Sequence, residues 1–382
     1  MRPIYLDYNA TTPLDSHVFE VIKPFFNVTW GNPSSIHQIG RRARVAMDDA
    51  RDKVASVFKC KPSEVVFTSG GTESNNLALF GSVRTRRRKG KHIVTSRIEH
   101  HAVLHALDYL EQNEGFEVTR VVVDSEGRID PDLIQGELRA DTTLVSVMAA
   151  NNEIGTIQPV ARIGALCHER GILFHTDAVQ WFGKEPFKDI HQFNADLVSV
   201  CAHKMYGPKG TGALYIRSPL LPDPILFGGG HENERRAGTE NLAGIIGLAE
   251  VMQRFVQEPV FPAERLWTMT RRLETALSAI NRVQLVSPKA GRLANTVSFL
   301  AKGTDSIALL ANLDMEGVCA SSGSACSAGS LQPSHVVESL GVDRSLANSL
   351  VRFSLGRETT EEEIEAVIML LPQVIDRAQT SQ

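Results

Sequence analysis

Short apolar runs alternate with helix-like stretches between residues 65 and 216, and this alternation limits the fold more than any other feature of the sequence. The runs are rich in β-branched residues and comprise Val65–Thr68, His92–Thr95, Val118–Val123, Leu144–Met148, Ile172–His175 and Leu197–Val200. Nearly continuous apolar strands joined by helices are typical of a mostly parallel sheet that helices cover on both faces. We therefore predict an α/β fold. Because ligands bind beyond the carboxyl ends of the strands in such sheets, the residues directly after each run are the candidates for function.

The pattern changes after Gly228–Gly230, where longer helical stretches begin. We expect helices over Leu242–Val256 and Leu266–Ile280. The later strands are expected at Thr296–Phe299 and Leu350–Phe353, and the later helices at Asp305–Leu313 and Glu361–Val374. This mixture suits a smaller α+β unit. The expected division is a large domain over residues 15–258 and a small domain formed by residues 1–14 and 259–382.

The charge and the cysteines exclude several classes of protein. The formal net charge of −4 provides no basic surface of the kind that grips nucleic acid. No apolar run approaches the length of a membrane span. The cysteine count is odd and no C-x-x-C pair occurs, so neither a disulfide framework nor a structural zinc site is expected. The cysteines are Cys60, Cys167, Cys201, Cys319 and Cys326. A cytoplasmic protein with reduced thiols fits best.

Three strand ends carry residues suited to a phosphate, a flat ring or a cap. Gly70 and Gly71 open a predicted helix, where glycines leave backbone N–H groups accessible to a phosphate. The segment matches neither the dinucleotide-binding nor the P-loop fingerprint, and a tight strand-to-helix turn is the alternative interpretation. His100 can stack on a ring or transfer protons near neutral pH, although histidines also decorate helix starts. Asn152 follows another strand, where capping is the default role.

Two further strand ends carry a carboxylate and an amine. Asp177 ends an apolar run, and a buried carboxylate needs a donating partner such as a protonated pyridine nitrogen; capping of the next helix is the alternative. Lys204 lies between a strand and a Gly-Pro turn, where a lysine can lose its proton and act as a nucleophile, although an exposed loop lysine is the ordinary interpretation. Phosphate cradle, carboxylate, stacking histidine and amine together are the parts that pyridoxal 5′-phosphate (PLP) requires.

These motifs occur with others in an order that resembles one enzyme family, the cysteine desulfurases of the NifS/IscS type within the aspartate-aminotransferase-like superfamily of PLP enzymes. The resemblance runs almost from end to end and is carried by residues 5–13, 31–35, 67–76, 99–100, 151–155, 175–180, 203–210, 228–232, 237–239, 321–326 and 352–357. Its most specific motif is Ser-Ser-Gly-Ser-Ala-Cys over residues 321–326. The resemblance implies the PLP-dependent transferase (aspartate-aminotransferase-like) fold, with a large domain built on the mostly parallel sheet and a smaller α+β domain.

The resemblance also implies which residues surround the cofactor ring. Lys204 would hold the cofactor as a Schiff base, and Asp177 would pair with the pyridinium nitrogen. His100 would stack on the ring and take part in proton transfers. Asn152 and Gln180 would contact the hydroxyl side of the ring.

The phosphate and the substrate are assigned in the same way. Gly71, Thr72 and His203 would hold the phosphate together with Thr239 from a second subunit, so a homodimer is implied. Arg352 would bind the substrate carboxylate through two hydrogen bonds, a planar match that lysine cannot reproduce, and Asn152 would be a second substrate-binding residue.

The implied reaction converts L-cysteine to L-alanine and leaves the sulfur on Cys326 as a persulfide. Residues 321–330 consist of Ser, Gly and Ala apart from Cys326, a composition that predicts a mobile loop over about residues 321–333. Such a loop would carry sulfur from the cofactor to an acceptor protein, for example an iron-sulfur scaffold. Only the thiolate is a good nucleophile, so His100 or the substrate intermediate would assist Cys326.

Other functions stay open at this point. The same cofactor site would suit a selenocysteine lyase or a cysteine/cystine C–S lyase. An alternative outside the enzymes is a sulfur carrier or scaffold subunit that keeps the fold and needs a partner for turnover. The basic run from Arg84 to Lys91 indicates either a docking patch for an acidic partner or tRNA, or a solvated helix end, which we favour.

One residue departs from the family pattern. Cys201 stands where relatives commonly have serine, and its S–H is a weaker donor to a phosphate oxygen. Either PLP is held slightly less tightly or the backbone is sufficient to hold it. We favour a small buried packing residue over a redox role for Cys201. We interpret Cys60, Cys167 and Cys319 as structural.

Overall fold

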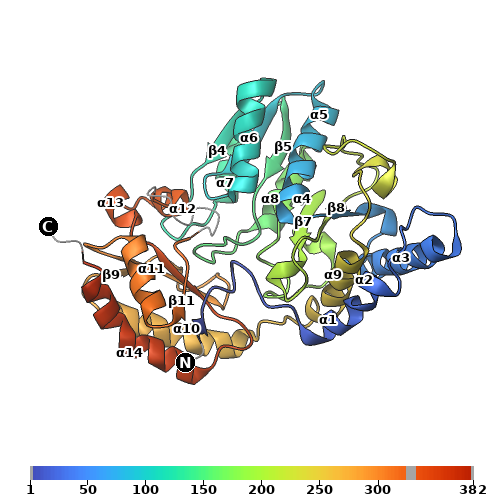
Figure 1. The fold of residues 1–382 in the computed structure, drawn as a ribbon. Helices are drawn as coiled ribbons and strands as arrows, with labels where there is room; N and C mark the ends of the chain where they lie inside the picture. Colours follow the sequence, from blue (N-terminus) through green and yellow to red (C-terminus); the bar gives the residue numbers. More distant parts are fainter. Residues whose placement is uncertain (1–2, 324–332, 380–382) are drawn as a thin grey trace.

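A seven-stranded sheet forms the centre of the larger part of the molecule (Figure 1). The computed structural model describes residues 3–323 and 333–379. In spatial order the strands are β2 (Val65–Thr68), β8 (Gly212–Ile216), β7 (Leu197–Cys201), β6 (Leu173–Asp177), β5 (Thr142–Ser146), β3 (His92–Ser96) and β4 (Glu117–Val121). Neighbouring strands are parallel except β8, which is antiparallel to both β2 and β7. The predicted α/β fold with a mostly parallel sheet is confirmed, and each of the six predicted runs overlaps a strand.

Adjacent residues of the central strands enter two different apolar cores. Leu144 of β5 and Leu173 of β6 belong to one cluster of buried side chains, whereas their neighbours Val145 and Phe174 belong to another. Because successive side chains point to opposite faces of a strand, helices must cover both faces. One face carries α4 (Gly71–Asn76), α5 (Ser82–Arg86) and α6 (His101–Glu114), and the other carries α3 (Gln38–Phe58), α7 (Pro131–Glu137), α8 (Val160–Glu169) and α9 (Leu242–Phe255).

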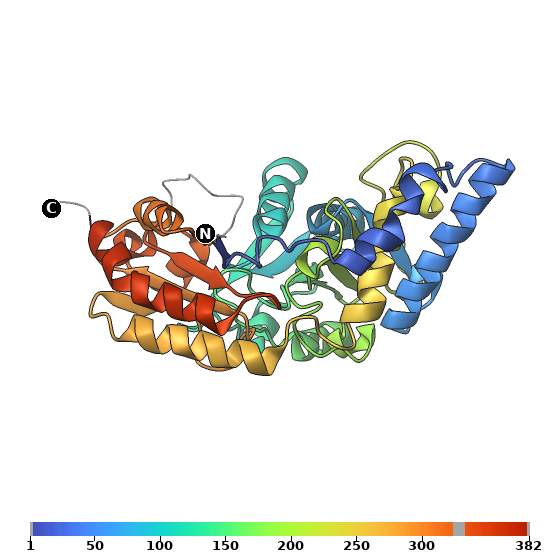
Figure 2. The same ribbon diagram turned by 60° about the horizontal axis from the view of Figure 1, so that its bottom comes forward.

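A second, smaller unit lies beside the large sheet (Figure 2). Its three antiparallel strands are β12 (Val351–Ser354), β10 (Thr296–Ala301) and β9 (Val283–Leu285), in that order. The helices of this unit are α10 (Ala263–Ser278), α11 (Ser306–Met315), α12 (His335–Ser339), α13 (Arg344–Ala347) and α14 (Glu361–Arg377). The expected strands near Thr296 and Leu350 are thus present. The domain limits at residues 14 and 258 stay a prediction. None of the helices in the described ranges is long and apolar enough to cross a membrane.

The N-terminal segment connects the two units. Its strand β1 (Ile4–Tyr5) pairs in parallel with β11 (Val318–Cys319). The backbone then bonds to Ser354 of the small sheet, and Thr12 N–H donates to the carbonyl oxygen of His203 beyond β7. The segment ends in α1 (Ser16–Ile22) and α2 (Pro24–Asn27) on the large unit. Figure 2 shows this dark-blue segment running between the two units.

Candidate active site

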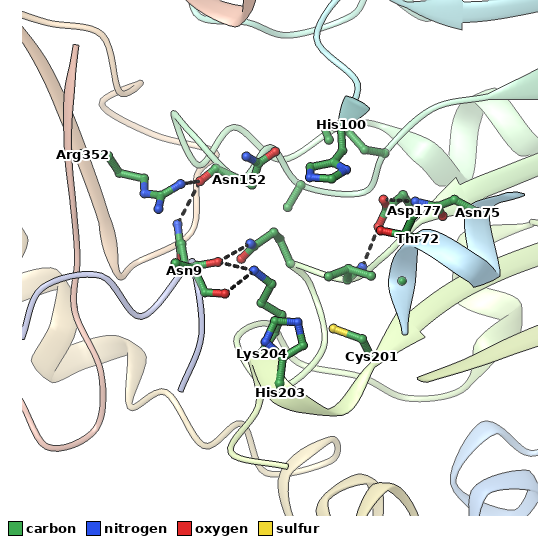
Figure 3. A pocket seen from close by; sticks show the side chains of 16 residues that line it. Asn9, Thr72, Asn75, His100, Asn152, Asp177, Cys201, His203, Lys204 and Arg352 are labelled. Atoms are coloured by element: carbon green, nitrogen blue, oxygen red, sulfur yellow. Dashed lines mark hydrogen bonds between the residues drawn. The ribbon is translucent and has the colours of Figure 1, made fainter. Parts of the chain in front are cut away.

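One pocket collects the residues that follow the carboxyl ends of the strands (Figure 3). Its volume is about 210 Å³. Ten of the residues predicted from the sequence line it: Gly71, Thr72, His100, Asn152, Asp177, Gln180, Cys201, His203, Lys204 and Arg352. The remaining lining residues are Asn9, Ala10, Asn75, Met148, Ala150 and Val179, which the sequence did not single out.

Asp177, the last residue of β6, is held by two donors. The side-chain Nδ2 of Asn75 donates to its Oδ2 at 2.6 Å, and the backbone N–H of Val179 donates to its Oδ1 at 3.0 Å. Asn75 lies on α4, five residues after Gly70, so the turn that begins the helix also fixes the carboxylate. Because both oxygens are oriented, Asp177 can present its charge in one direction into the pocket.

The turn before α4 requires glycine at two successive positions. Gly70 has a φ of 151°, a conformation that other residues rarely adopt. A Cβ on Gly71 would lie 2.7 Å from Cγ2 of Val179 on the facing loop. The backbone at the start of α4 therefore stays uncovered, which is the condition for close approach of a phosphate group.

His100 is the N-cap of α6 and is held as a neutral ring. Its Nδ1 accepts a hydrogen bond from the backbone N–H of Ala102 at 3.1 Å, which places the proton of the neutral ring on Nε2. Burial lowers the pKa of His100, and the charge of Asp177, which acts in the opposite direction, has a smaller effect. The ring is therefore uncharged at neutral pH and has one N–H to offer.

Lys204 lies on a single helical turn, Ala202–Lys204, directly after β7. Its Nζ donates to the backbone carbonyl oxygens of Asn9 at 2.6 Å and Ala10 at 2.7 Å. Both carbonyls belong to the N-terminal segment that joins the two units. The amine is therefore held at the point where the large unit, the small unit and the N-terminal segment meet.

Two neighbours of Lys204, Cys201 and His203, are uncharged at neutral pH. Burial raises the pKa of the Cys201 thiol to about 11, so it stays protonated at neutral pH. Burial and the charge of Lys204 lower the pKa of His203 to about 4, and its Nδ1 lies 3.1 Å from Oγ1 of Thr11. A buried, protonated Cys201 agrees with its interpretation as a packing residue.

Asn9 is the residue to which most of the polar groups connect. It is buried, and its carbonyl oxygen accepts from Lys204 and, at 2.9 Å, from Nε2 of Gln180. Its side-chain Nδ2 donates to Oγ1 of Thr296 at 2.9 Å and to the carbonyl oxygen of Asn152 at 3.2 Å. One asparagine thus aligns residues from both sheets around the pocket.

Arg352 enters the pocket from the small sheet and is only 1% exposed. Its Nη2 donates to Oδ1 of Asp7 at 2.7 Å, and its Nη1 donates to the carbonyl oxygens of Asn152 at 2.9 Å and Gly323 at 2.6 Å. Its Nε has no hydrogen-bond partner among the described residues. A buried guanidinium with an unused N–H is suited to an additional oxygen ligand such as a carboxylate.

The polar groups of the pocket fit PLP in chemical kind. An uncovered backbone turn suits the phosphate, an oriented carboxylate suits a protonated pyridine nitrogen, and an amine suits an aldehyde. The unused N–H of Arg352 adds a place for an acid substrate.

One predicted site residue of the described ranges lies elsewhere. Thr239 lines a separate pocket of about 90 Å³ together with Gly238 and Arg236. Its predicted role from a second subunit stays a prediction. Cys326 and most of the predicted mobile loop lie outside the described residues.

The other cysteines have the surroundings of structural residues. Burial raises the pKa of Cys60 to about 12, that of Cys167 to about 12, and that of Cys319 less strongly. Over residues 3–323 and 333–379 no cluster of His, Cys, Asp and Glu could hold a metal ion.

The basic run is partly used inside the molecule. Arg84 pairs with Glu114 at 2.6 Å, and Lys89 Nζ donates to the carbonyl oxygen of Gly171 at 2.8 Å. Lys91 Nζ donates to the carbonyl oxygen of Glu114 at 3.0 Å. These contacts tie the end of α5 to neighbouring elements, in agreement with the interpretation as a helix end.

Comparison with known proteins gives a consistent set of similarities. Residues 4–367 match the family model described as aminotransferase class-V. The cysteine desulfurase IscS of Dictyoglomus turgidum is 46% identical over 99% of this chain and 96% of its own length, and that of Methanosarcina thermophila is 43% identical over 98% and 93%. A solved structure of a NifS-like protein has 36% identity and a TM-score of 0.91, covering 98% of this chain and 99% of its own. SspA in complex with cysteine has 33% identity and a TM-score of 0.82, covering 94% and 100%.

Proposed function

We propose that this chain, which belongs to the class-V aminotransferase family and within it to the cysteine desulfurases of the NifS/IscS type, is a PLP-dependent enzyme that converts L-cysteine to L-alanine. The observation that carries the proposal is a single pocket lined by the amine of Lys204, the carboxylate of Asp177 and the guanidinium of Arg352. These groups match three needs of the reaction: an attachment point for an aldehyde cofactor, a partner for its ring nitrogen, and a receiver for the substrate carboxylate.

The residues around the ring would orient the cofactor, which when bound supplies an electron sink for the charge left at the substrate α-carbon. Asp177 would keep a proton on the ring nitrogen, because Asn75 and Val179 hold its two oxygens in place. The backbone at Gly71 would receive the phosphate. His100 would cover one face of the ring, and the unused Nε of Arg352 would bind the substrate carboxylate.

Two atoms in the pocket would move protons. Nε2 of His100 carries the proton of a neutral ring, because Nδ1 is occupied by the Ala102 N–H. Nζ of Lys204 would be a second proton carrier in the same pocket. The surroundings of His100 favour its uncharged form at neutral pH.

The sulfur step balances without an external oxidant or reductant. The C–S bond of cysteine breaks and an S–S bond forms with the thiolate of Cys326. The substrate β-carbon is reduced to the methyl group of alanine, while the transferred sulfur is oxidised to the persulfide level. The Cys326 thiol loses one proton, and the β-carbon of alanine gains one, so the protons balance. Cysteine and an enzyme thiol thus give alanine and an enzyme persulfide.

The test combines products and protein mass. Treatment with L-cysteine should produce alanine and add one sulfur to Cys326, and Cys326→Ser should lower alanine formation by at least about 100-fold while leaving the bound-cofactor spectrum intact. Lys204→Ala should lose the lysine-bound cofactor spectrum. Pyruvate in place of alanine would identify a C–S lyase, and much faster turnover of selenocysteine would identify a selenocysteine lyase. A colourless wild-type protein would favour a sulfur carrier or scaffold.

The persulfide would then pass to an acceptor protein, such as an iron-sulfur scaffold, in a compartment that keeps thiols reduced, for which the cytoplasm is the expectation. The same mass measurement, made after mixing with candidate acceptors, follows loss of the added sulfur from this chain and its gain by the acceptor.

We also infer a homodimer from the surface of the large unit. Apolar side chains stand exposed between α2 and the start of α3: Phe26, Val28, Trp30, Ile36 and Ile39, with Ile36 89% exposed. An apolar surface of this kind marks an interface. Thr239 lines a pocket other than that of Lys204, so a role at the phosphate requires a second copy of the chain.

A further inference from the structure

Lys184 is a buried amine next to the residues that line the pocket. It follows Asp177 by seven residues, at the end of the turns after β6, and only 3% of the residue is exposed. Its Nζ lies 5.3 Å from the ring centroid of Phe261. Among the described residues it has no ion pair with a carboxylate, which is unusual because a buried charge normally has a partner.

The two hydrogen bonds of Lys184 both go to side-chain amide oxygens. Its Nζ donates to Oδ1 of Asn9 at 2.7 Å and to Oε1 of Gln180. Asn9 and Gln180 both line the pocket, whereas Lys184 does not. A neutral amine has two N–H groups, so both find an acceptor here.

Burial is the main cause that lowers the pKa of Lys184 well below its ordinary value, and the nearby charge of Lys204 adds to it. A methionine at this position would avoid the cost of burying an amine. A lysine at this position is therefore better explained by its hydrogen bonds to Asn9 and Gln180 than by packing.

The amine decides which way the Gln180 amide points. Since Nζ can donate only when it faces an acceptor, the oxygen of Gln180 must point toward Lys184 and its NH₂ must point away. One N–H of that group then donates to the carbonyl oxygen of Asn9 at 2.9 Å, the same oxygen that receives Lys204. The second N–H is left for the pocket. A flipped amide would instead present its oxygen to the pocket.

We propose that Lys184 is a positioning residue, whose amine fixes Gln180 so that an N–H faces the hydroxyl side of the cofactor ring, and fixes Asn9 so that its carbonyl oxygen receives Lys204. This inference rests on the proposed PLP-dependent function. A ring oxygen would find a donor in the observed orientation of Gln180 and a repelling oxygen in the flipped one.

The first experiment compares Lys184→Met with wild type and with Lys188→Met, which removes an exposed lysine four residues later. Titration with pyridoxal 5′-phosphate should give a Kd about tenfold higher for Lys184→Met, the effect of one misplaced hydrogen-bond donor, and an unchanged Kd for Lys188→Met. The ratio of the absorption bands of the bound cofactor should also change only in Lys184→Met. Unchanged Kd and spectrum in a folded Lys184→Met protein would overturn the proposal.

The second experiment separates a positioning role from general support of the fold. If Lys184 acts through Gln180, the double variant Lys184→Met/Gln180→Ala should bind PLP within about twofold of Gln180→Ala alone, because the two effects are not independent. Independent effects, which multiply in Kd, would contradict the proposal. Should Lys184→Met not fold, Lys184→Gln is tested in its place with the opposite expectation: it keeps an N–H donor, so its Kd for PLP should lie within about twofold of wild type, and a Kd about tenfold higher would contradict the proposal. A wild-type protein that binds no PLP would instead refute the proposed function itself.

Discussion

Glu99 precedes His100 in the chain and is completely buried. Ser96 Oγ donates to its Oε1 at 2.5 Å and the Met148 N–H donates to the same oxygen at 3.1 Å, while Oε2 has no partner among the described residues. Burial raises the pKa of Glu99 to about 8, so the group is mostly protonated at neutral pH. At the scale of single residues, burial thus sets the charge of the residue next to His100.

The raised pKa of Glu99 predicts a pH-dependent stability. The protonated group stabilises the fold fully below its unfolded pKa near 4.5, and this stabilisation is lost as the pH rises through about 8. Glu99→Gln keeps the shape without the ionisation. Urea unfolding measures the free energy of unfolding of both proteins. Between pH 5 and pH 8 this free energy should rise in Glu99→Gln relative to wild type by roughly 1 kcal/mol per pH unit. A difference in unfolding free energy that stays constant with pH would contradict the raised pKa of Glu99. The exposed control Glu169→Gln is expected to show such a constant difference.

Cys201 predicts a gain of affinity. A serine hydroxyl is a stronger hydrogen-bond donor than a thiol and is of similar size, so Cys201→Ser should bind PLP about fivefold more tightly, equivalent to one ordinary hydrogen bond. Equilibrium titration of the cofactor checks this. Equal or weaker binding would mean that the backbone alone holds the phosphate and that Cys201 only fills space.

Single residues also show the limit of prediction from the sequence. Asp177 and Lys204 could be predicted because Asp177 ends one apolar strand and Lys204 lies in the turn after another. Asn75 and Lys184 could not, since neither has a local pattern that tells a site residue from an ordinary polar one. Their roles arise from contacts with Asp177 and Gln180 across 102 and 4 residues, which only the folded chain reveals.

At the scale of elements, the turn after β7 depends on the N-terminal segment. Thr12 is buried, and its Oγ1 donates to the carbonyl oxygen of His203 at 3.0 Å. Oγ1 of Thr12 also accepts a hydrogen bond from the Tyr206 N–H at 2.8 Å. Tyr206 has a φ of 65°, which a non-glycine residue adopts only when its surroundings hold it. One hydroxyl thus closes the turn that carries Lys204.

Thr12→Val should therefore loosen this turn. The change leaves the Tyr206 N–H buried without an acceptor, at a cost of about 1–3 kcal/mol in the free energy of unfolding. Urea unfolding measures this, with Thr268→Val on the exposed side of α10 as a control expected to stay within about 0.5 kcal/mol. If Thr12→Val lowers the free energy of unfolding no more than the control does, the turn is stable without the Thr12 hydroxyl.

Elements differ in how much of their structure can be predicted from their own residues. Six strands of the large sheet could be predicted because their apolar runs are unbroken. The seventh, β8, is reversed relative to its neighbours, and no residue in Gly212–Ile216 signals that direction. Similarly, β1 consists of Ile4–Tyr5 alone and exists only because β11 lies beside it. Short elements that need a partner carry too little local information.

At the scale of the whole molecule, the proposed dimer makes a prediction about mixed subunits. If Thr239 serves the site of the partner, a subunit with Lys204→Ala still contributes an intact Thr239. A hybrid of Lys204→Ala and Thr239→Val subunits then contains one complete site. Desulfurase assays of refolded or co-expressed mixtures should exceed the average of the two parents, whereas activity at that average would place Thr239 in its own site or in none.

The bond between the backbone N–H of Asn9 and Oγ of Ser354 spans 345 residues of the chain. A ribosome therefore makes Ser354 long after Asn9. The carbonyl oxygen that receives Lys204 gains its final position only after synthesis has passed Ser354. A growing chain that is shorter than this has no finished pocket in which the proposed cofactor could be attached.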